Sequence, residues 1–226
     1  RDPEMSRGLG DVYKRQKKSS ILILIIICLV GCKKGSNETT ITGEIKGFGT
    51  DTLYLYGMDE LYDRIDTIYV ENDKFSYTTS VDTITSAYLL LKNRIEYPVF
   101  LDKGNKIKIK GDTINLNFLT ISGNIYNEEF TDFQKALEDP ADPSEKAGEE
   151  TVDKRITVEK ANTAEEMAEE FILQHHSSYV SLYLLDKYFV QKETPDFSKI
   201  KKLVEVMTGV LQDKPYIERL NETITQ

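Results

Sequence analysis

The sequence predicts an α+β protein by segments: an antiparallel β-sandwich or barrel of about eight strands, followed by a small helical domain. Two observations predict this division. From Thr39 to about Ser122 the apolar residues recur with a period of two, which is typical of half-buried strands. After Gly123 they recur with the helical period instead. Many short strands separated by polar turns indicate a sandwich or a barrel.

Three local patterns in the strand-rich part, residues 39–123, carry more specific predictions. Residues 106–110 read Lys-Ile-Lys-Ile-Lys, so we expect the lysines to face solvent on one side of a strand. Residues 65–70 and 75–77 flank a four-residue polar turn, which predicts a hairpin between them. Pro98 has no N–H to donate to a neighbouring strand, so its strand is expected at a sheet edge or at a strand start.

Residues 124–226 are predicted to be helical. The segment 144–170 is highly charged and nearly free of large apolar residues, which suits either a solvated helix or a mobile connector. Apolar spacing, capping residues and prolines predict the individual helices. These are Asn127–Glu138, Thr163–Gln174 with Thr163 as its cap, a helix starting at Ser177 or Ser178, Phe197–Leu211, and a short last helix from Pro215. This segment is expected to be incomplete at its C-terminus.

The N-terminal part has the organisation of a bacterial export signal. Two lysines precede an apolar run that ends in the small residue Gly31, and residues 17–31 form this predicted signal peptide. The cysteine directly after the small residue resembles the lipobox of bacterial lipoproteins. In that family a peptidase recognises the residues before the cysteine, here Leu29, Val30 and Gly31, and the cysteine carries the lipid. The resemblance implies cleavage after Gly31, lipid on Cys32 and a polar tether at residues 32–38.

Two other readings of the apolar run stay open. A membrane-spanning helix needs about 20 apolar residues, whereas Ile21 to Gly31 supplies eleven and is closed by two lysines. A plain secretory signal without lipid is the second alternative. Residues 1–16 have no apolar period, and we interpret them as a non-native leader, with an unusually long charged region as the alternative. The expected location is the cell envelope of a Gram-negative-type bacterium, on the outer membrane facing the periplasm.

Composition excludes several classes of chemistry for the expected mature chain. The sequence contains two cysteines, Cys28 and Cys32, of which the first leaves with the signal and the second is occupied by lipid. A chain without a free thiol cannot perform thiol chemistry. Removal of residues 1–31 leaves 23 Lys/Arg and 35 Asp/Glu, a net charge of about −12. Nucleic acid is therefore not an expected partner, because phosphate contacts require clustered basic residues.

The sequence predicts no catalytic residue, no cofactor and no metal site. His175 and His176 are its only histidines, and adjacent helical residues do not share a face as a zinc-binding pair at i and i+4 would. We interpret them as helix C-terminal residues. Four aspartates could pair as acid and base, but their turn-like contexts favour solvated carboxylates: Asp63, Asp66, Asp102 and Asp112. The 13 tyrosines suit half-buried packing better than a ligand platform.

The order of segments resembles the N-terminal region of TlpA-like (AhpC/TSA-type) thiol–disulfide oxidoreductase lipoproteins. The resemblance spans roughly Lys17 to Leu220. It rests on the order of three segments: the lipobox, a strand-rich block and a helical segment. Its residues are Gly43, Tyr54, Asp66-Thr67, Lys74-Phe75-Ser76, Phe100-Leu101, Gly104 and the phrase from Ser178 to Leu185. Members of that family begin with a β-rich domain of unknown function and end with a thioredoxin domain that contains a Cys-x-x-Cys pair. This chain departs from the family because that domain and its cysteine pair are absent from the sequence.

Two functions stay in competition, and the resemblance to TlpA-like lipoproteins implies the first of them. In the first, the chain is the non-catalytic anchor and spacer of a membrane-anchored periplasmic oxidoreductase, docks periplasmic protein clients, and is truncated before its thioredoxin domain. In the second, it is a stand-alone periplasmic lipoprotein that binds a ligand or a protein partner through its β-domain. In both, the membrane is a partner through the lipid on Cys32.

Overall fold

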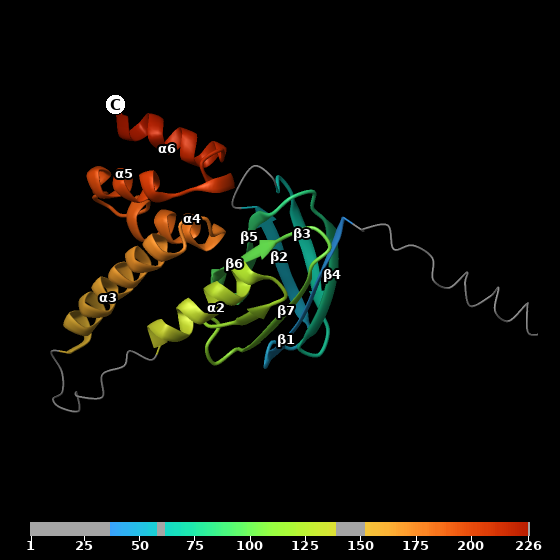
Figure 1. Ribbon diagram of the computed structural model, residues 1–226. Helices are drawn as coiled ribbons and strands as arrows, with labels where there is room; N and C mark the ends of the chain where they lie inside the picture. The colour runs from blue at the N-terminus through green and yellow to red at the C-terminus, as the bar shows by residue number, and fades with distance from the viewer. Residues whose placement is uncertain (1–36, 58–61, 139–151, 226) are drawn as a thin grey trace, which may run out of the picture. The chain divides into compact units, whose positions relative to one another are not determined.

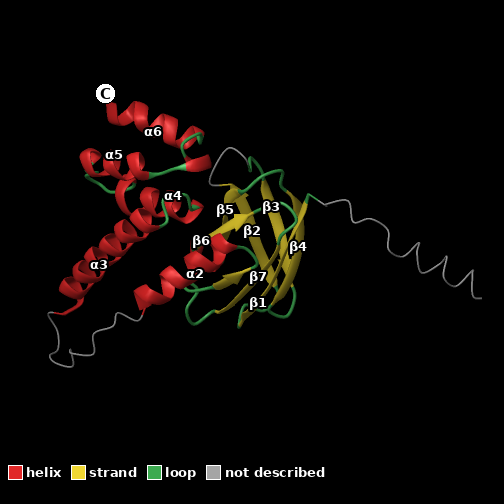
Figure 2. Cartoon of the chain, in the orientation of Figure 1, coloured by secondary structure: helices red, strands yellow, loops and turns green. Residues whose placement is uncertain are grey.

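The computed structural model describes residues 37–57, 62–138 and 152–225 (Figure 1). Residues 37–226 form one compact unit. Its first part is an open sandwich of two four-stranded sheets, with strand orders β4-β1-β7-β8 and β3-β2-β5-β6. The strands are β1 (Glu38–Lys46), β2 (Asp51–Gly57), β3 (Ile65–Val70), β4 (Lys74–Ser80), β5 (Thr85–Leu90), β6 (Glu96–Leu101), β7 (Lys106–Asp112) and β8 (Thr120–Ser122). The predicted fold class, a sandwich of eight strands followed by helices, is confirmed (Figure 2).

The pairing of the strands differs from the sequence prediction at two places. The expected hairpin between residues 65–70 and 75–77 is wrong, because β3 pairs with β2 and β4 pairs with β1. Only the bridge between Glu71 and Lys74 closes the turn, and the two strands then diverge into opposite sheets. Strands β1 and β7 pair in parallel, unlike the other pairs. A parallel pair needs a long connection, which here runs through the second sheet.

The core lies between the two sheets and is aliphatic. Ile41 of β1 and Ile107 of β7 face Leu53 and Leu55 of β2 and Leu89 of β5, and none of these five side chains is exposed. In β1 and β7 the buried residues alternate with exposed or half-buried ones, as in a sheet with one solvated face. The predicted outward lysines of residues 106–110 are confirmed by the burial pattern of β7. The edge position predicted from Pro98 is also confirmed, because β6 is the last strand of its sheet.

Helix α2 (Ile125–Glu138) packs against β8 and β6, the last strands of the two sheets, and closes one open side of the sandwich. The buried side chain of Asn127 accepts a hydrogen bond from the Phe100 N–H of β6 at 3.0 Å and donates to the Phe100 carbonyl at 2.8 Å. The hydroxyl of Thr131 does the same for the N–H and carbonyl of Ile121 in β8, both at 3.0 Å. Backbone groups of edge strands are free to pair with other chains, so α2 satisfies them internally.

The remaining helices follow the predicted order with shifted ends. They are α3 (Val152–Gln174), α4 (Tyr179–Leu185), a π-helical turn (Asp186–Val190), α5 (Phe197–Val206), a 3₁₀ turn (Gly209–Leu211) and α6 (Pro215–Thr225). Ser178 is confirmed as the cap of α4, since its hydroxyl accepts the Val180 N–H at 3.2 Å. Pro215 starts the last helix as predicted.

Two helix predictions were wrong at one end. Thr163 is no cap, because α3 begins at Val152 and Thr163 lies inside it. The helix predicted for residues 197–211 is interrupted at Met207, whose backbone is extended with ψ 141°. Gly209 then adopts a positive φ of 65°, a conformation that glycine allows at little cost.

Candidate functional site

The residues predicted for lipidation and peptidase recognition, Cys32, Leu29, Val30 and Gly31, lie outside the described residues. Their predicted roles therefore stay predictions. Within the ranges that the structure describes, no helix has the length and apolar character required to cross a bilayer.

A polar cluster closes the second open side of the sandwich, where edge strands β3 and β4 meet. We call it the edge cluster: Tyr62, Arg64, Asp66, Tyr77 and Thr79. Arg64 Nε donates to Asp66 Oδ2 at 3.1 Å, and its terminal nitrogen donates to the Thr79 hydroxyl and, at 3.2 Å, to the Ser80 carbonyl. The Tyr62 hydroxyl also donates to Asp66 Oδ2. The cluster thus bonds a strand of one sheet to a strand of the other.

The edge cluster holds its carboxylate charged and its phenols protonated. Burial favours a raised pKa for Asp66, but hydrogen bonds from Tyr62 and Tyr77 and the charge of Arg64 outweigh it, and the pKa is lowered. Burial, followed by the hydrogen bond to Asp66, raises the pKa of Tyr77 to about 12 and raises that of Tyr62 as well. A general acid or base works best with a pKa near the operating pH. These groups are therefore suited to holding charge and structure rather than to transferring protons.

A small pocket of about 260 Å³ opens beside the edge cluster. Its lining residues come from the segment before β3 and from the end of β4: Tyr62, Asp63, Arg64, Ser80, Val81, Asp82 and Thr83. The Arg64 side chain is 46% exposed, and its guanidinium carbon lies 4.8 Å from the centre of the Tyr62 ring. An arginine held by several hydrogen bonds at a pocket mouth can bind a carboxylate or another polar group. The pocket can therefore bind a polar ligand through Arg64.

Asp63 lines this pocket, whereas Asp102 and Asp112 bond nearby backbone groups in turns, as the sequence indicated. Asp102 Oδ1 accepts the N–H of Lys103 at 2.8 Å. Asp112 Oδ1 accepts the N–H of Ile114 at 2.9 Å, directly after β7. Aspartate side chains commonly bond nearby backbone groups in this way. Of the four predicted carboxylates, Asp66 is the one that the structure brings into a network of side chains from two sheets.

The two histidines follow the end of α3 and bind different neighbours. The ring of His175 stacks on Phe171 at 4.2 Å between centres, and its Nδ1 lies 3.4 Å from Glu129 Oε1. His176 Nδ1 lies 2.7 Å from the Thr208 hydroxyl. Among the residues whose placement is described, no three His, Cys, Asp or Glu side chains gather in a way that could hold a metal ion.

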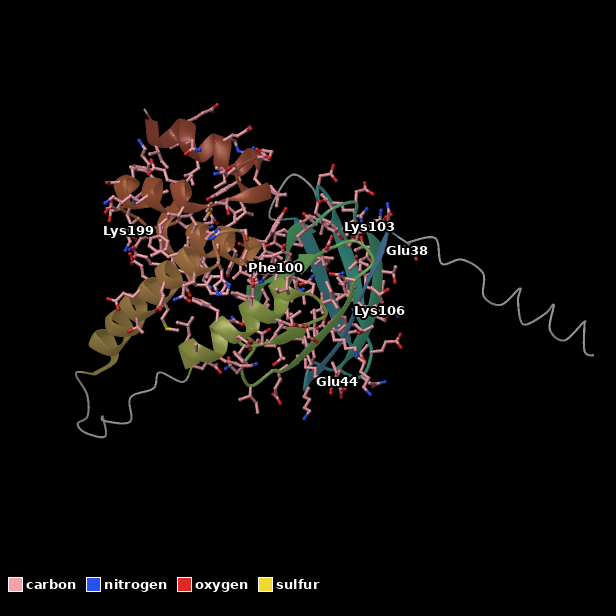
Figure 3. The ribbon with its side chains drawn as sticks, in the orientation of Figure 1. Glu38, Glu44, Phe100, Lys103, Lys106 and Lys199 are labelled. Atoms are coloured by element: carbon pink, nitrogen blue, oxygen red, sulfur yellow. The ribbon has the colours of Figure 1, made fainter. Side chains whose placement is uncertain are left out.

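An aromatic interface between the sandwich and the helices was not predicted. The Tyr183 ring of α4 packs edge-on against Tyr88 of β5 at 6.5 Å and against Phe130 of α2 at 5.2 Å between centres. The ring centres of Tyr126 of α2 and Phe100 of β6 lie 6.3 Å apart. Phe100 is labelled in Figure 3. Edge-to-face ring pairs stabilise the folded state by about 0.5–1.5 kcal/mol more than the burial of their area alone. The sequence signal for this interface was the high proportion of aromatic and apolar residues in the segment from residue 178 to 185.

Polar contacts reinforce the same interface. The Ser178 hydroxyl, besides capping α4, donates to Glu129 Oε2 of α2 at 2.5 Å. The Tyr216 hydroxyl of α6 donates to Asp186 Oδ1 in the π-helical turn at 2.5 Å. Burial raises the pKa of Tyr88 to about 12, so this phenol is protonated at neutral pH. The helices are thereby joined to one another and to the sandwich.

Comparison with known proteins assigns a family to the β-rich part alone. Residues 39–130 match the family described as "Domain of unknown function (DUF4369)". The match covers the strands from β1 to β8 and the first turns of α2, including Asn127 and Phe130. No curated protein matches the chain.

Proposed function

We propose that residues 37–226 are the non-catalytic spacer and docking module of a lipid-anchored envelope protein that carries a thioredoxin-like domain. The proposal takes the anchor from the lipobox-like residues ending at Cys32, and the redox domain from the resemblance to TlpA-like lipoproteins. In the parent protein the chemistry would be attack of a thiolate on a disulfide through a mixed disulfide. Residues 37–226 contain no cysteine, so this chemistry belongs outside them.

The aromatic interface of Tyr183 is the observation that best supports a spacer. A flexible linker would leave the helices free of the sandwich, whereas here Tyr183 packs on both β5 and α2. Interfaces between domains of one chain are usually more polar than obligate protein–protein interfaces, and they permit the domains to move relative to each other. A core shared between the sandwich and the helices would hold any following domain at a fixed position relative to the sandwich.

The second candidate is a stand-alone lipoprotein that binds a ligand or a protein partner. The pocket beside the edge cluster favours it, because Arg64 combines a fixed guanidinium with an exposed side at the pocket mouth. Both candidates share the proposed location, the outer membrane facing the periplasm, and the lipid on Cys32.

Two experiments test the first candidate. An insulin-reduction assay with this chain is expected to give no turnover, and turnover above background would contradict the non-catalytic role. The reading frame after codon 226 is expected to encode a Cys-x-x-Cys pair within a thioredoxin-like domain; an immediate stop codon would favour the second candidate instead. Mass spectrometry of the Cys32 peptide from membranes tests the anchor separately, since it reads the lipid directly.

A further inference from the structure

The solvent face of the sheet β4-β1-β7-β8 is rich in lysine. Strand β7 points three lysines outward, and strands β1 and β4 add one each. We call this surface the lysine face, and its exposed lysines are Lys46 of β1, Lys74 of β4, and Lys106, Lys108 and Lys110 of β7. Figure 3 labels Lys106 at the start of β7 and Glu44 on β1.

The strand register spreads these charges over the face. Glu44 stands between Lys110 on one side and Lys74 on the other, and Lys46 is paired with Asp112. Lys106 and Lys108 instead stand beside threonines of β1. Glu38 of β1, which is paired with Ser80, lies on the same face. The five lysines outnumber the three carboxylates Glu38, Glu44 and Asp112, so the face is positive.

The basic character of this face contrasts with the rest of the molecule. Residues 37–226 contain 21 Lys/Arg and 35 Asp/Glu, so the surface elsewhere is strongly acidic. A positive face on a protein of negative net charge gives the molecule an electric dipole, which orients it in an electric field. A negatively charged surface would attract the lysine face and repel the remainder, which selects one orientation.

One end of the lysine face is hollowed into a depression of about 490 Å³. Lys46, Lys110 and Thr120 line it together with the half-buried ring of Phe118. Glu44, Gly111, Asp112 and Asn115 complete the lining. Two lysines and two carboxylates line the depression, so it adds no net positive charge to the face.

The chain that precedes β1 limits how far this face can lie from a membrane. Five residues separate Cys32 from Glu38, the first residue of β1, and the six Cα–Cα steps between them span about 20 Å when the chain is extended. It enters the sheet at the end of β1 where Thr40 pairs with Lys106. Lys33 and Lys34 add two further positive charges on the tether itself.

We propose that the lysine face docks on anionic phospholipid headgroups of the membrane to which Cys32 tethers the chain. This inference rests on the lipid anchor of the proposed function. Basic residues near an anionic bilayer each contribute about 1 kcal/mol of attraction. The attraction acts within about 8 Å at physiological ionic strength, and a tether that reaches about 20 Å lets the face approach the bilayer to that distance. Docking would fix the height and orientation of the whole module above the bilayer.

The test uses residues 32–226, in which Cys32 is the only thiol, coupled through that thiol to a maleimide phospholipid in vesicles. Vesicles of phosphatidylcholine alone are compared with vesicles rich in phosphatidylglycerol. The rate of amine acetylation at each lysine is then read by mass spectrometry. Because the lipid is supplied chemically, the result does not depend on whether cells lipidate Cys32, and the two proposals can fail separately.

On the anionic vesicles, acetylation of Lys106, Lys108 and Lys110 is expected to slow at least about fivefold, given the attraction per lysine. Lys201 and Lys202 of α5, which are exposed, serve as internal controls and are expected to react equally on both vesicles. High salt is expected to abolish the protection, because it screens charges between surfaces. Equal rates at the lysine face on both vesicles, or protection that persists at high salt, would overturn the proposal.

A matched pair of variants separates the lysine face from charge in general. Replacing Lys108→Glu together with Lys110→Glu is expected to remove the protection of Lys106 on anionic vesicles. Replacing Lys201→Glu together with Lys202→Glu changes the net charge equally and is expected to leave that protection intact. Both pairs are exposed, so the fold is expected to survive. Loss of protection in both variants would contradict a specific face.

Discussion

Replacing Thr131 of α2 with valine is expected to lower the free energy of unfolding of residues 37–226 by about 3 kcal/mol. Valine has nearly the same shape as threonine but lacks the hydroxyl that bonds the N–H and the carbonyl of Ile121 at 3.0 Å each. Both bonds are buried, and a buried backbone group left unpaired costs about 1–3 kcal/mol. Two such groups, after partial relaxation, give the figure of about 3 kcal/mol.

Urea unfolding followed by circular dichroism measures this difference. The slope of the unfolding free energy against urea concentration is expected to be the same in the variant and the wild type, because the surface area exposed on unfolding does not change. In a thermal scan the same loss corresponds to a decrease in Tm of about 6–12 °C for a domain of this size. The control is Thr120→Val in β8, which makes the same chemical change at an exposed position and is expected to stay within about 0.5 kcal/mol of wild type. A Thr131→Val cost below about 1 kcal/mol would refute the view that α2 satisfies the edge strands.

Three further predictions concern other parts of the unit. Gly43→Ala would place a methyl group against the Phe75 ring that covers it, so a loss of about 1–3 kcal/mol in unfolding free energy is expected, and a smaller loss in a Phe75→Leu background; equal losses in both backgrounds would contradict the contact. The lowered pKa of Asp66, against an ordinary value of 3.8, means that its ionised form adds stability above that pH and loses it as the pH falls. The stability advantage over Asp66→Asn, measured by urea unfolding, is therefore expected to be full at neutral pH and to shrink below about pH 4, and a difference that is constant with pH would argue against it. Tyr183→Ala is expected to cost about 3–5 kcal/mol and Tyr183→Phe less than about 1, because phenylalanine keeps the ring contacts; similar costs for the two would mean that the hydroxyl matters more than packing.

The sequence predicted the parts of the fold that depend on local pattern. Strict alternation in β7 and the missing N–H of Pro98 each constrain one strand directly, and Ser178 caps a helix with its own side chain. Strand partners depend on distant residues, so the turn after β3 suggested a hairpin that the structure does not contain. Alternation says which face is buried but not which sheet the strand joins.

The polar groups that close the sandwich could not have been foreseen. Asn127 and Thr131 lie on the apolar face of α2, where a helical pattern predicts packing rather than hydrogen bonds to strand edges. Asp66 was considered as an acid or base, but its partners Tyr62 and Arg64 become neighbours through the segment leading into β3, and Thr79 comes from the other sheet. Such contacts arise from tertiary structure, and no spacing in the sequence encodes them.

The distance between one point on the sandwich and one on the helices tests the central claim, a rigid module, most directly. Residues 37–226 contain no cysteine, so Lys108→Cys in β7 and Glu170→Cys in α3 allow two spin labels at exposed positions. Pulsed electron spin resonance is expected to give a single narrow distance distribution that broadens when Tyr183→Ala is added. A broad or multiple distribution in the chain that retains Tyr183 would contradict the claim that the helices are locked to the sandwich.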